Sequence, residues 1–409
     1  LSIYMKFKYI LIAIVISLSF NSCDFLLGKK KDDQVNQVFE QGRIDPKLYP
    51  TNIGYVPVQP IWNGFSNPKD VFVGFDEMVY VIDDNGVHIL DLKGEEHFKI
   101  NIPGATDIIQ DRRQHTYVCG RIYKDIDNNG SLENLPAVYH FYNASAASGP
   151  IFVDTLIHPF CDATRNTEGF RGISDEQVEF TGVAALADNR IYVSRKGPKN
   201  LATTVAIADN SILIFDKNGS NIGYCNGLNP TNSNLKSTLD VASIATAQVP
   251  PQQYVDAPNW FYLVQQSPTA EYKVLQIKEF NDPDAGISYG ENQALINFDY
   301  SKADKFLYQS YRFKKPSDVY VAPDATGYVF VVDEQTDSLY QFTPKGFEGV
   351  NPAANSGITK QIIASFGGHG NGPFQFNQPS GVCYFKRTVY VADKGNNRIC
   401  RFKLSSDLE

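Results

Sequence analysis

Three stretches of this chain, far apart in the sequence, repeat one pattern of hydrophobic runs and turns. Each starts with a Pro-initiated run, continues to a second run that ends in Asp, and adds a third run after a polar turn. The copies cover residues 67–94, 315–346 and 378–402. Short β-branched and aromatic runs between Gly, Asn, Asp and Pro turns are typical of strands. We interpret each copy as three antiparallel strands of a β-propeller blade.

Weaker copies of the pattern fill the gaps between these three stretches. They lie at residues 105–142, 182–219 and 240–277, which brings the total to six. No long segment after Pro50 has a convincing helical period, so this part is predicted to be all β. A chain of 409 residues would otherwise suggest two or three domains. The repeats instead predict an all-β fold, a single six-bladed β-propeller over residues 51–409.

A closed ring needs a fourth, outer strand on every blade or some other cover for the exposed edge. Outer strands are predicted at 97–102, 151–157 and 361–366, but only seven residues, 403–409, follow the sixth copy. We therefore expect residues 53–61 to close the ring from the N-terminal side. Pro57 and Pro60 suit an edge strand, where a missing N–H can face solvent. Variable surface loops are expected at 120–137, 158–178, 195–210, 226–238, 279–293 and 347–360.

The last copy resembles an NHL repeat. Its Gly-rich lead and Pro-x-Gly-Val step are Gly367-Gly-His-Gly-Asn-Gly-Pro-Phe-Gln-Phe-Asn-Gln-Pro-Ser-Gly-Val382, followed by Val389-Tyr-Val-Ala-Asp-Lys-Gly-Asn-Asn-Arg-Ile399. The resemblance is specific in this copy, moderate in the first and fifth, and only topological in the other three. It implies a six-bladed propeller, and most proteins of this kind are binding platforms. A fold does not by itself establish an activity.

The N-terminal residues have the pattern of a targeting segment. Lys6 and Lys8 precede an apolar run of 12 residues, 9–20, which is shorter than a membrane-spanning helix. We interpret residues 1–22 as a signal peptide. The following Phe20-Asn21-Ser22-Cys23 resembles a bacterial lipoprotein box, although Phe20 stands where Leu is usual and Asn21 where a small residue is usual.

This resemblance implies a lipid on Cys23 and a membrane-anchored protein of the bacterial cell envelope, with the outer membrane as the expected site. The alternative is an ordinary secretory signal with an incidental cysteine. Residues 23–50 are then the lipidated Cys and a flexible tether, whose root-mean-square reach is about 30 Å.

Charge and cysteine content argue against two classes of function. Acidic residues outnumber basic ones by 45 to 37, so the chain lacks the positive surface needed for nucleic-acid binding. The five other cysteines show no CxxC spacing, which gives no support to a thiolate metal site. We expect mostly free, buried thiols at Cys119, Cys161, Cys225, Cys383 and Cys400.

One insertion has the spacing of a calcium-binding loop. Oxygen-bearing residues occupy alternate positions around Gly130, and the predicted ligands are Asp125, Asp127, Asn129, Ser131 and Glu133. The twelfth position is Pro136 rather than the Glu of an EF-hand. We expect a structural calcium ion here; the alternative is an Asx-rich hairpin turn without metal.

Two functions remain open from the sequence. The first is a binding or scaffold module for a protein, peptide or glycan partner, because loops on a rigid scaffold concentrate binding residues. Aromatic residues outside the strands are candidate contacts: Phe160, Phe170, Tyr254, Tyr308, Tyr311 and Phe347. The second is a metal-dependent hydrolase or lyase at the central channel, which requires several of Asp83, Asp333, Asp393, Glu179 and His369 to converge. His88, His97 and His140 lie in predicted strands and are expected to be packed or surface residues.

Overall fold

The computed structural model describes residues 43–48, 50, 52–126, 129–157, 176–201, 207–253, 259–353 and 356–408. Residues 44–409 form one compact unit, and β1 (Arg43–Ile44) and the 3-10 turn η1 (Pro46–Leu48) lie at its N-terminal limit. No helix in the described part of the chain is long and apolar enough to cross a membrane.

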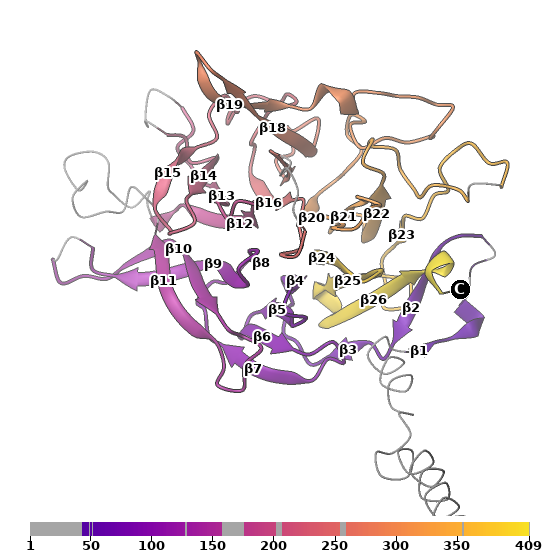
Figure 1. The fold of residues 1–409 in the computed structure, drawn as a ribbon, viewed down its shortest axis with the longest axis horizontal. Coiled ribbons are helices and arrows are strands. Elements are labelled where there is room, and N and C mark those ends of the chain that lie inside the picture. Colours follow the sequence, from indigo (N-terminus) through magenta and orange to yellow (C-terminus); the bar gives the residue numbers. More distant parts are fainter. Residues whose placement is uncertain are drawn as a thin grey trace, which may run out of the picture. The chain divides into compact units, whose positions relative to one another are not determined.

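Six separate antiparallel sheets stand around a common axis, which confirms the six-bladed propeller (Figure 1). From the axis outward, blade 1 consists of β4 (Asp70–Val73), β5 (Val79–Asp83), β6 (Gly86–Leu90) and β7 (Glu96–Ile100). Blade 2 consists of β8 (Ile108–Gln110), β9 (His115–Lys124), β10 (Glu133–Tyr142) and β11 (Ile151–Ile157). Blade 3 consists of β12 (Glu179–Ala185), β13 (Ile191–Lys196), β14 (Ser211–Phe215) and β15 (Asn221–Tyr224).

The second half of the ring follows the same order. Blade 4 consists of β16 (Val241–Thr246), β17 (Trp260–Gln265), β18 (Val274–Asp282) and β19 (Gly286–Glu291), and the turn η3 (Gln293–Leu295) follows it. Blade 5 consists of β20 (Pro316–Val321), β21 (Val329–Asp333), β22 (Ser338–Phe342) and β23 (Phe366–Gly367). Blade 6 has β24 (Pro379–Phe385), β25 (Thr388–Asp393) and β26 (Arg398–Leu404), with the turns η4 (Lys394–Asn396) and η5 (Ser405–Asp407).

The outer strand of blade 6 comes from the N-terminal side of the chain. β2 (Tyr55–Gln59) pairs antiparallel with β26, so that Tyr55 lies opposite Leu404 and Pro57 opposite Phe402. β3 (Trp62–Asn63) continues along the same strand. The predicted ring closure by residues 53–61 is therefore confirmed.

Blade 5 departs from the predicted strand pattern. Residues 361–366 were expected to form its outer strand, but β23 contains only Phe366 and Gly367. The reason is that Gln361 donates its backbone N–H to Lys302 O, 2.7 Å away, and Ile362 pairs with Val350 instead. The segment between β19 and β20 and the segment between β22 and β23, which we call the two excursions of blade 5, thus bind each other where the outer strand was expected.

Two of the predicted loops are in fact paired strands. In blade 2, β9 and β10 remain paired as far as Lys124 and Glu133, so most of 120–137 is a long hairpin. In blade 4, β18 and β19 pair up to Asp282 and Gly286, so 279–293 contains the outer strand. Hydrogen bonding between adjacent segments extends the sheets beyond the hydrophobic runs from which the strands were predicted.

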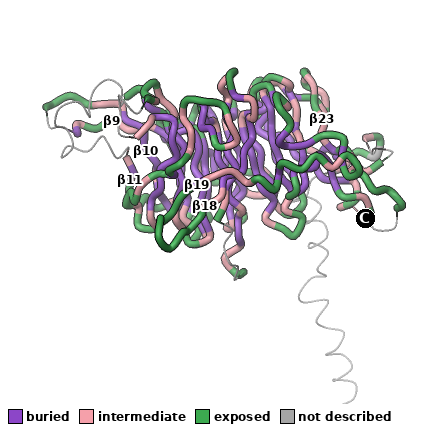
Figure 2. The backbone as a smooth tube through the Cα atoms, turned by 90° about the horizontal axis from the view of Figure 1, so that it is seen from above, coloured by how far each residue is buried: buried purple, intermediate pink, exposed green. Residues whose placement is uncertain are grey.

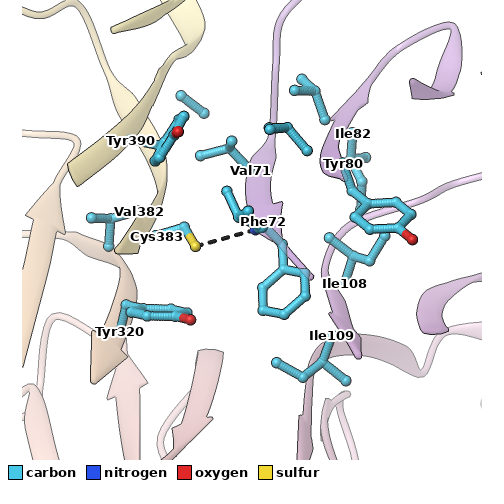
Figure 3. Packing of buried hydrophobic residues seen from close by; sticks show 14 of the residues in the cluster. Val71, Phe72, Tyr80, Ile82, Ile108, Ile109, Tyr320, Val382, Cys383 and Tyr390 are labelled. Atoms are coloured by element: carbon cyan, nitrogen blue, oxygen red, sulfur yellow. Dashed lines mark hydrogen bonds between the residues drawn. The ribbon is translucent and has the colours of Figure 1, made fainter. Parts of the chain in front are cut away.

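The core lies between neighbouring blades. Tyr80, Phe330 and Tyr390 occupy equivalent places in the second strands and are buried, as predicted from the repeat. Seen edge-on, buried residues fill the inner strands, and exposed residues lie at the turns and in outer strands such as β7, β11 and β15 (Figure 2). In Figure 3, side chains from blades 5 and 6, such as Tyr320, face Phe72 and its neighbours from blade 1.

The four cysteines in the described residues are free and buried: Cys119, Cys225, Cys383 and Cys400. Cys383 accepts a hydrogen bond from the backbone N–H of Val73 at 3.3 Å, drawn as the dashed line in Figure 3. The prediction of free thiols is confirmed for these four, whereas Cys161 lies outside the described residues.

Tyr55 tests the ring closure. Its ring packs against Phe366 and Phe402, and its hydroxyl donates to Gln341 Oε1 at 2.7 Å. Replacing Tyr55 with Ala should lower the free energy of unfolding by about 3–5 kcal/mol, because a large aromatic side chain leaves a cavity. Tyr55→Phe should cost about 1–3 kcal/mol, since it leaves a buried acceptor without its donor.

Urea unfolding of both variants measures these losses. Tyr123→Ala is the control, because Tyr123 is exposed on the blade 2 hairpin. A loss in Tyr55→Ala no larger than in the control would contradict closure by this strand.

Candidate functional site: the propeller axis

One position recurs in the innermost strand of every blade or, in blade 2, directly before it. In blades 1, 5 and 6 it lies two residues after the opening Pro, at Asp70, Asp318 and Gly381. Blades 2, 3 and 4 place Asp107, Gly182 and Ser243 there. Three carboxyl groups therefore approach the axis of the ring from three different blades.

Each of these carboxyl groups joins its own blade to the next one. Asp70 accepts the backbone N–H of Ile108 at 3.2 Å, and Asp107 accepts that of Val183 at 2.7 Å. The third carboxyl group, that of Asp318, makes the same kind of bond.

Asp318 accepts the backbone N–H of Val382 at 2.7 Å. Its other oxygen accepts the hydroxyl of Ser243 at 2.5 Å, which adds the joint between blades 4 and 5. These residues therefore act as side-chain bridges between strands of separate sheets.

A second set of bridges lies one residue earlier in the inner strands. Four hydroxyl groups donate to backbone carbonyls of the following blade, at distances of 2.6–3.0 Å. The pairs are Thr106 to Phe180, Thr181 to Val241, Ser317 to Pro379 and Ser380 to Pro68.

A cavity of about 20 Å³ lies among the axial side chains. Its lining includes the three carboxyl groups together with Thr246 and Gln248. This volume holds about one water molecule.

Burial raises the pKa of all three axial carboxyl groups. Burial raises the pKa of Asp318 to about 8, and the nearby Asp70 adds to the effect. Burial and the charges of Asp70 and Asp318 raise the pKa of Asp107 well above its usual range. The carboxyls of Asp70 and Asp107 are hydrogen-bonded to each other, as expected when one of them carries a proton.

The residues proposed from the sequence for a central catalytic site do not meet at the axis. Asp83, Asp333 and Asp393 end the second strands of three different blades, and each accepts backbone N–H groups of its own blade. Such residues fix turns, which explains why the repeat carries them.

The other two candidates are also elsewhere. Glu179 pairs with Lys196 at 3.0 Å, and His369 is 75% exposed beside Asp337. Among the described residues, no three His, Cys, Asp or Glu side chains are grouped so that they could hold a metal ion. The convergence that the hydrolase or lyase alternative requires is therefore not found among these five residues.

Two of the three axial carboxyl groups can be recognised in the sequence by a repeated motif. The motifs Asn67-Pro-Lys-Asp70 and Lys315-Pro-Ser-Asp318 place an acid at one repeat position. An acid in a strand that is otherwise hydrophobic indicates either a buried partner or a site.

The predicted calcium loop is the tip of the β9–β10 hairpin. Asp125 accepts the backbone N–H groups of Asn129 at 3.1 Å and Gly130 at 2.9 Å. Asn129 accepts the N–H of Ser131, and Glu133 accepts that of Ile126. Asp127 lies outside the described residues. These bonds form a turn whose oxygens face the backbone, and calcium binding stays a prediction.

The aromatic residues that were predicted to contact a partner differ in their exposure. Tyr311 is exposed, whereas Tyr308 and Phe347 are buried, so the expectation was wrong for these two. Phe160, Phe170 and Tyr254 lie outside the described residues, as do the signal peptide and Cys23.

The excursions of blade 5 hold an exposed aromatic group that the sequence analysis missed. Phe298 and Tyr300 make edge contacts with the buried ring of Phe306, at centroid distances of 5.0 and 5.2 Å. Phe306 in turn contacts Phe347 at 5.9 Å. We call Phe298, Tyr300 and Phe306 the rim aromatic cluster.

Asp318 tests the axial chemistry. Its folded pKa, about 8, lies above the ordinary Asp value near 3.9, so the folded chain holds a proton that the unfolded chain releases between about pH 4 and 8. Its contribution to stability is full below about pH 4 and is lost as the pH rises toward 8. Asn cannot ionise. The free energy of unfolding of Asp318→Asn should therefore fall less between pH 5 and pH 9 than that of the wild type.

Urea unfolding at pH 5, 7 and 9 measures this slope. The exposed Asp304→Asn serves as the control and should keep the wild-type slope. An Asp318→Asn slope equal to that of the wild type would show that this carboxyl is ionised throughout.

Comparison with known protein families agrees with the repeat. The NHL repeat family matches residues 376–402, which confirms that repeat in blade 6. No curated protein matches the chain significantly. Among solved structures, the chain is similar to an auxiliary nutrient binding protein from Bacteroides ovatus, with 12% identity over 89% of this chain and 75% of that one and a TM-score of 0.49.

Two further solved structures are similar over most of the chain. A protein of unknown function from Bacteroides thetaiotaomicron has 14% identity, covering 88% of this chain and 74% of that one, with a TM-score of 0.49. A PQQ-bound aldose sugar dehydrogenase from Streptomyces coelicolor has 12% identity, covering 87% and 99%, with a TM-score of 0.47. The family match thus covers one blade, and the ring of six is a finding of the structure.

Proposed function

We propose that this chain is a lipid-anchored, extracytoplasmic β-propeller that binds a protein, peptide or glycan partner. The observation that carries the proposal is the rim aromatic cluster. Tyr300 is 65% exposed and Phe298 is 42% exposed, although both rings are held against a buried aromatic base. Exposed aromatic rings held in place are frequent anchors of binding surfaces.

The backbone below the cluster is fixed by hydrogen bonds between the two excursions. Leu307 donates its N–H to Gly346 O at 2.8 Å, and Glu348 donates to Lys305 O at 3.0 Å. Together with the bond from Gln361 to Lys302, these hold residues 302–307 against residues 346–348 and 361. A surface that is already ordered loses little conformational entropy on binding.

Further exposed apolar side chains occur on the same two excursions. Ile296, Ile358 and Ile363 are each exposed. In Figure 1 these excursions lie on the outer side of β22 and β23, in the orange and gold part of the chain. The proposed binding surface is therefore the rim of blade 5, where a regular outer strand is almost absent.

The alternative of a metal-dependent hydrolase or lyase has less support. The axial carboxyl groups already bridge the blades, and the cavity between them has room for about one water molecule. We therefore favour binding over catalysis, and the net charge of −8 argues against nucleic acid as the partner.

The lipid anchor rests on the sequence around Cys23. Cys23→Ser should move the protein from the membrane fraction to the soluble fraction, because the modified thiol is removed. Fractionation of cells and labelling with a fatty-acid analogue measure this, and the buried Cys225→Ser is the control. Labelling that persists in Cys23→Ser would place the lipid elsewhere or disprove it.

The rim surface is tested with a photo-crosslinking amino acid at position 300 in the native cell envelope. We expect one defined adduct, sensitive to protease if the partner is a protein or peptide and to glycosidases if it is a glycan. Phe298→Ser should weaken binding by about 2 kcal/mol, the size of an interface hot spot, and reduce the adduct.

The control places the same amino acid at position 123, because Tyr123 is 60% exposed but lies on the hairpin of blade 2, outside the cluster. Equal adducts at both positions, or none at position 300, would count against the rim of blade 5 as the binding surface.

A further inference from the structure

Three ionisable side chains form a linear chain across blade 2. His140 Nδ1 lies 2.8 Å from Asp154 Oδ1, and His140 Nε2 lies 2.7 Å from His115 Nδ1. They come from β11, β10 and β9, three neighbouring strands of one sheet. These three side chains take no part in the repeat pattern, in the axial bridges or in the proposed rim surface.

The pairing register brings the three side chains to one face of the sheet. His140 lies opposite Asp154 on one side and Tyr117 on the other. His115 is two residues before Tyr117, so it is a diagonal neighbour of His140 on the same face. Such a position depends on the strand register and not on the spacing along the chain.

Tyrosine rings hold both imidazoles in place. Tyr117 stacks on His140 with a centroid distance of 4.5 Å and an angle of 14°. Tyr142 stacks on His115 at 5.4 Å and 21°. The stacked tyrosines therefore restrain each imidazole from tilting out of its plane and leave it able to turn within that plane.

Hydrogen-bond chemistry fixes the proton positions. A carboxylate only accepts, so His140 donates its Nδ1 proton to Asp154 and keeps a lone pair on Nε2. His115 donates its Nδ1 proton to that lone pair. Burial lowers the pKa of His115, against the opposing charge of Asp111, which favours the neutral imidazole. Arg113 and Tyr117 also face this cluster, and both contact Asp111.

We propose that His115 and His140 bind a divalent transition metal ion, Cu²⁺ in preference to Zn²⁺, in place of the proton that they share. Two imidazole nitrogens are ligands that suit these metals. The carboxylate on the outer nitrogen of His140 is the partner that metal-ligating histidines almost always have. Asp154 would therefore orient the ligand without touching the metal.

The separation of the two nitrogens argues for the choice of metal. With metal–nitrogen distances of about 2.0 Å, two nitrogens at a right angle lie about 2.8 Å apart, whereas tetrahedral ligands lie about 3.3 Å apart. The observed 2.7 Å matches the right angle of a tetragonal Cu²⁺ site. Zn²⁺ would require the two strands or rings to move apart.

Metal binding requires one proton of His115 to move. The metal lies off the line between the nitrogens, so both rings turn toward it, and His115 can turn because it is only half-buried. Its Nδ1 proton moves to Nε2, and the metal takes the lone pair left behind. Among the described residues, no three His, Cys, Asp or Glu side chains are placed to hold one ion together, so water or a small ligand would occupy its other positions.

The test is titration of the full chain in detergent with Cu²⁺ and Zn²⁺, followed by electron paramagnetic resonance of the Cu²⁺ form. We expect binding of one Cu²⁺ with two nitrogen ligands, tighter than Zn²⁺. His115→Gln should abolish this two-nitrogen signal. Asp154→Asn should keep both nitrogens but weaken Cu²⁺ binding about 10–100-fold, the usual effect of losing an outer partner.

The controls are His97→Gln and His369→Gln, which remove exposed histidines outside the cluster. Both should retain the two-nitrogen Cu²⁺ signal. An unchanged signal in His115→Gln, a signal with one nitrogen in the wild type, or tighter binding of Zn²⁺ than of Cu²⁺ would overturn the proposal. Because His115 and Asp154 are partly exposed, their variants are expected to fold, and thermal unfolding without metal verifies this.

Discussion

The structure depends on side-chain bridges between inner strands that belong to different sheets. Each blade completes its backbone hydrogen bonds within its own sheet, so the backbone ladders do not join one blade to the next. Near the axis, carboxyl and hydroxyl groups make these joints instead, and every adjacent pair of blades has at least one. A buried polar group that finds such a partner avoids the cost of desolvation without compensation.

The fold could be predicted from the sequence because its local pattern is repeated. Tyr80, Phe330 and Tyr390 occupy one repeat position, and all are buried between blades as that position requires. The closing strand was predictable because the third strand of the last copy needs a partner at its outer edge, which β2 provides. The outer strand of blade 5 could not be predicted in this way, because it is displaced by a contact between Lys302 and Gln361, which are far apart in the sequence.

The axial site was harder to predict, for a physical reason. An Asp at the end of a strand, such as Asp333, and an Asp inside the first strand, such as Asp318, look equally functional in a sequence. The structure separates them because Asp333 accepts N–H groups of its own turn, whereas Asp318 is enclosed by three blades. The histidine pair of blade 2 was likewise invisible, since its members are 25 residues apart and meet only through the strand register.

The two glycines of the axial position limit how such a ring can change over time. A Cβ atom on Gly381 would lie 2.6 Å from Asp70 Oδ1, and one on Gly182 would lie 2.8 Å from the backbone nitrogen of Ile244. Each glycine thus provides the space that a neighbouring blade occupies. Blades of this ring are therefore not interchangeable modules: a duplicated or shuffled blade fits only beside a neighbour whose axial residue has the complementary size.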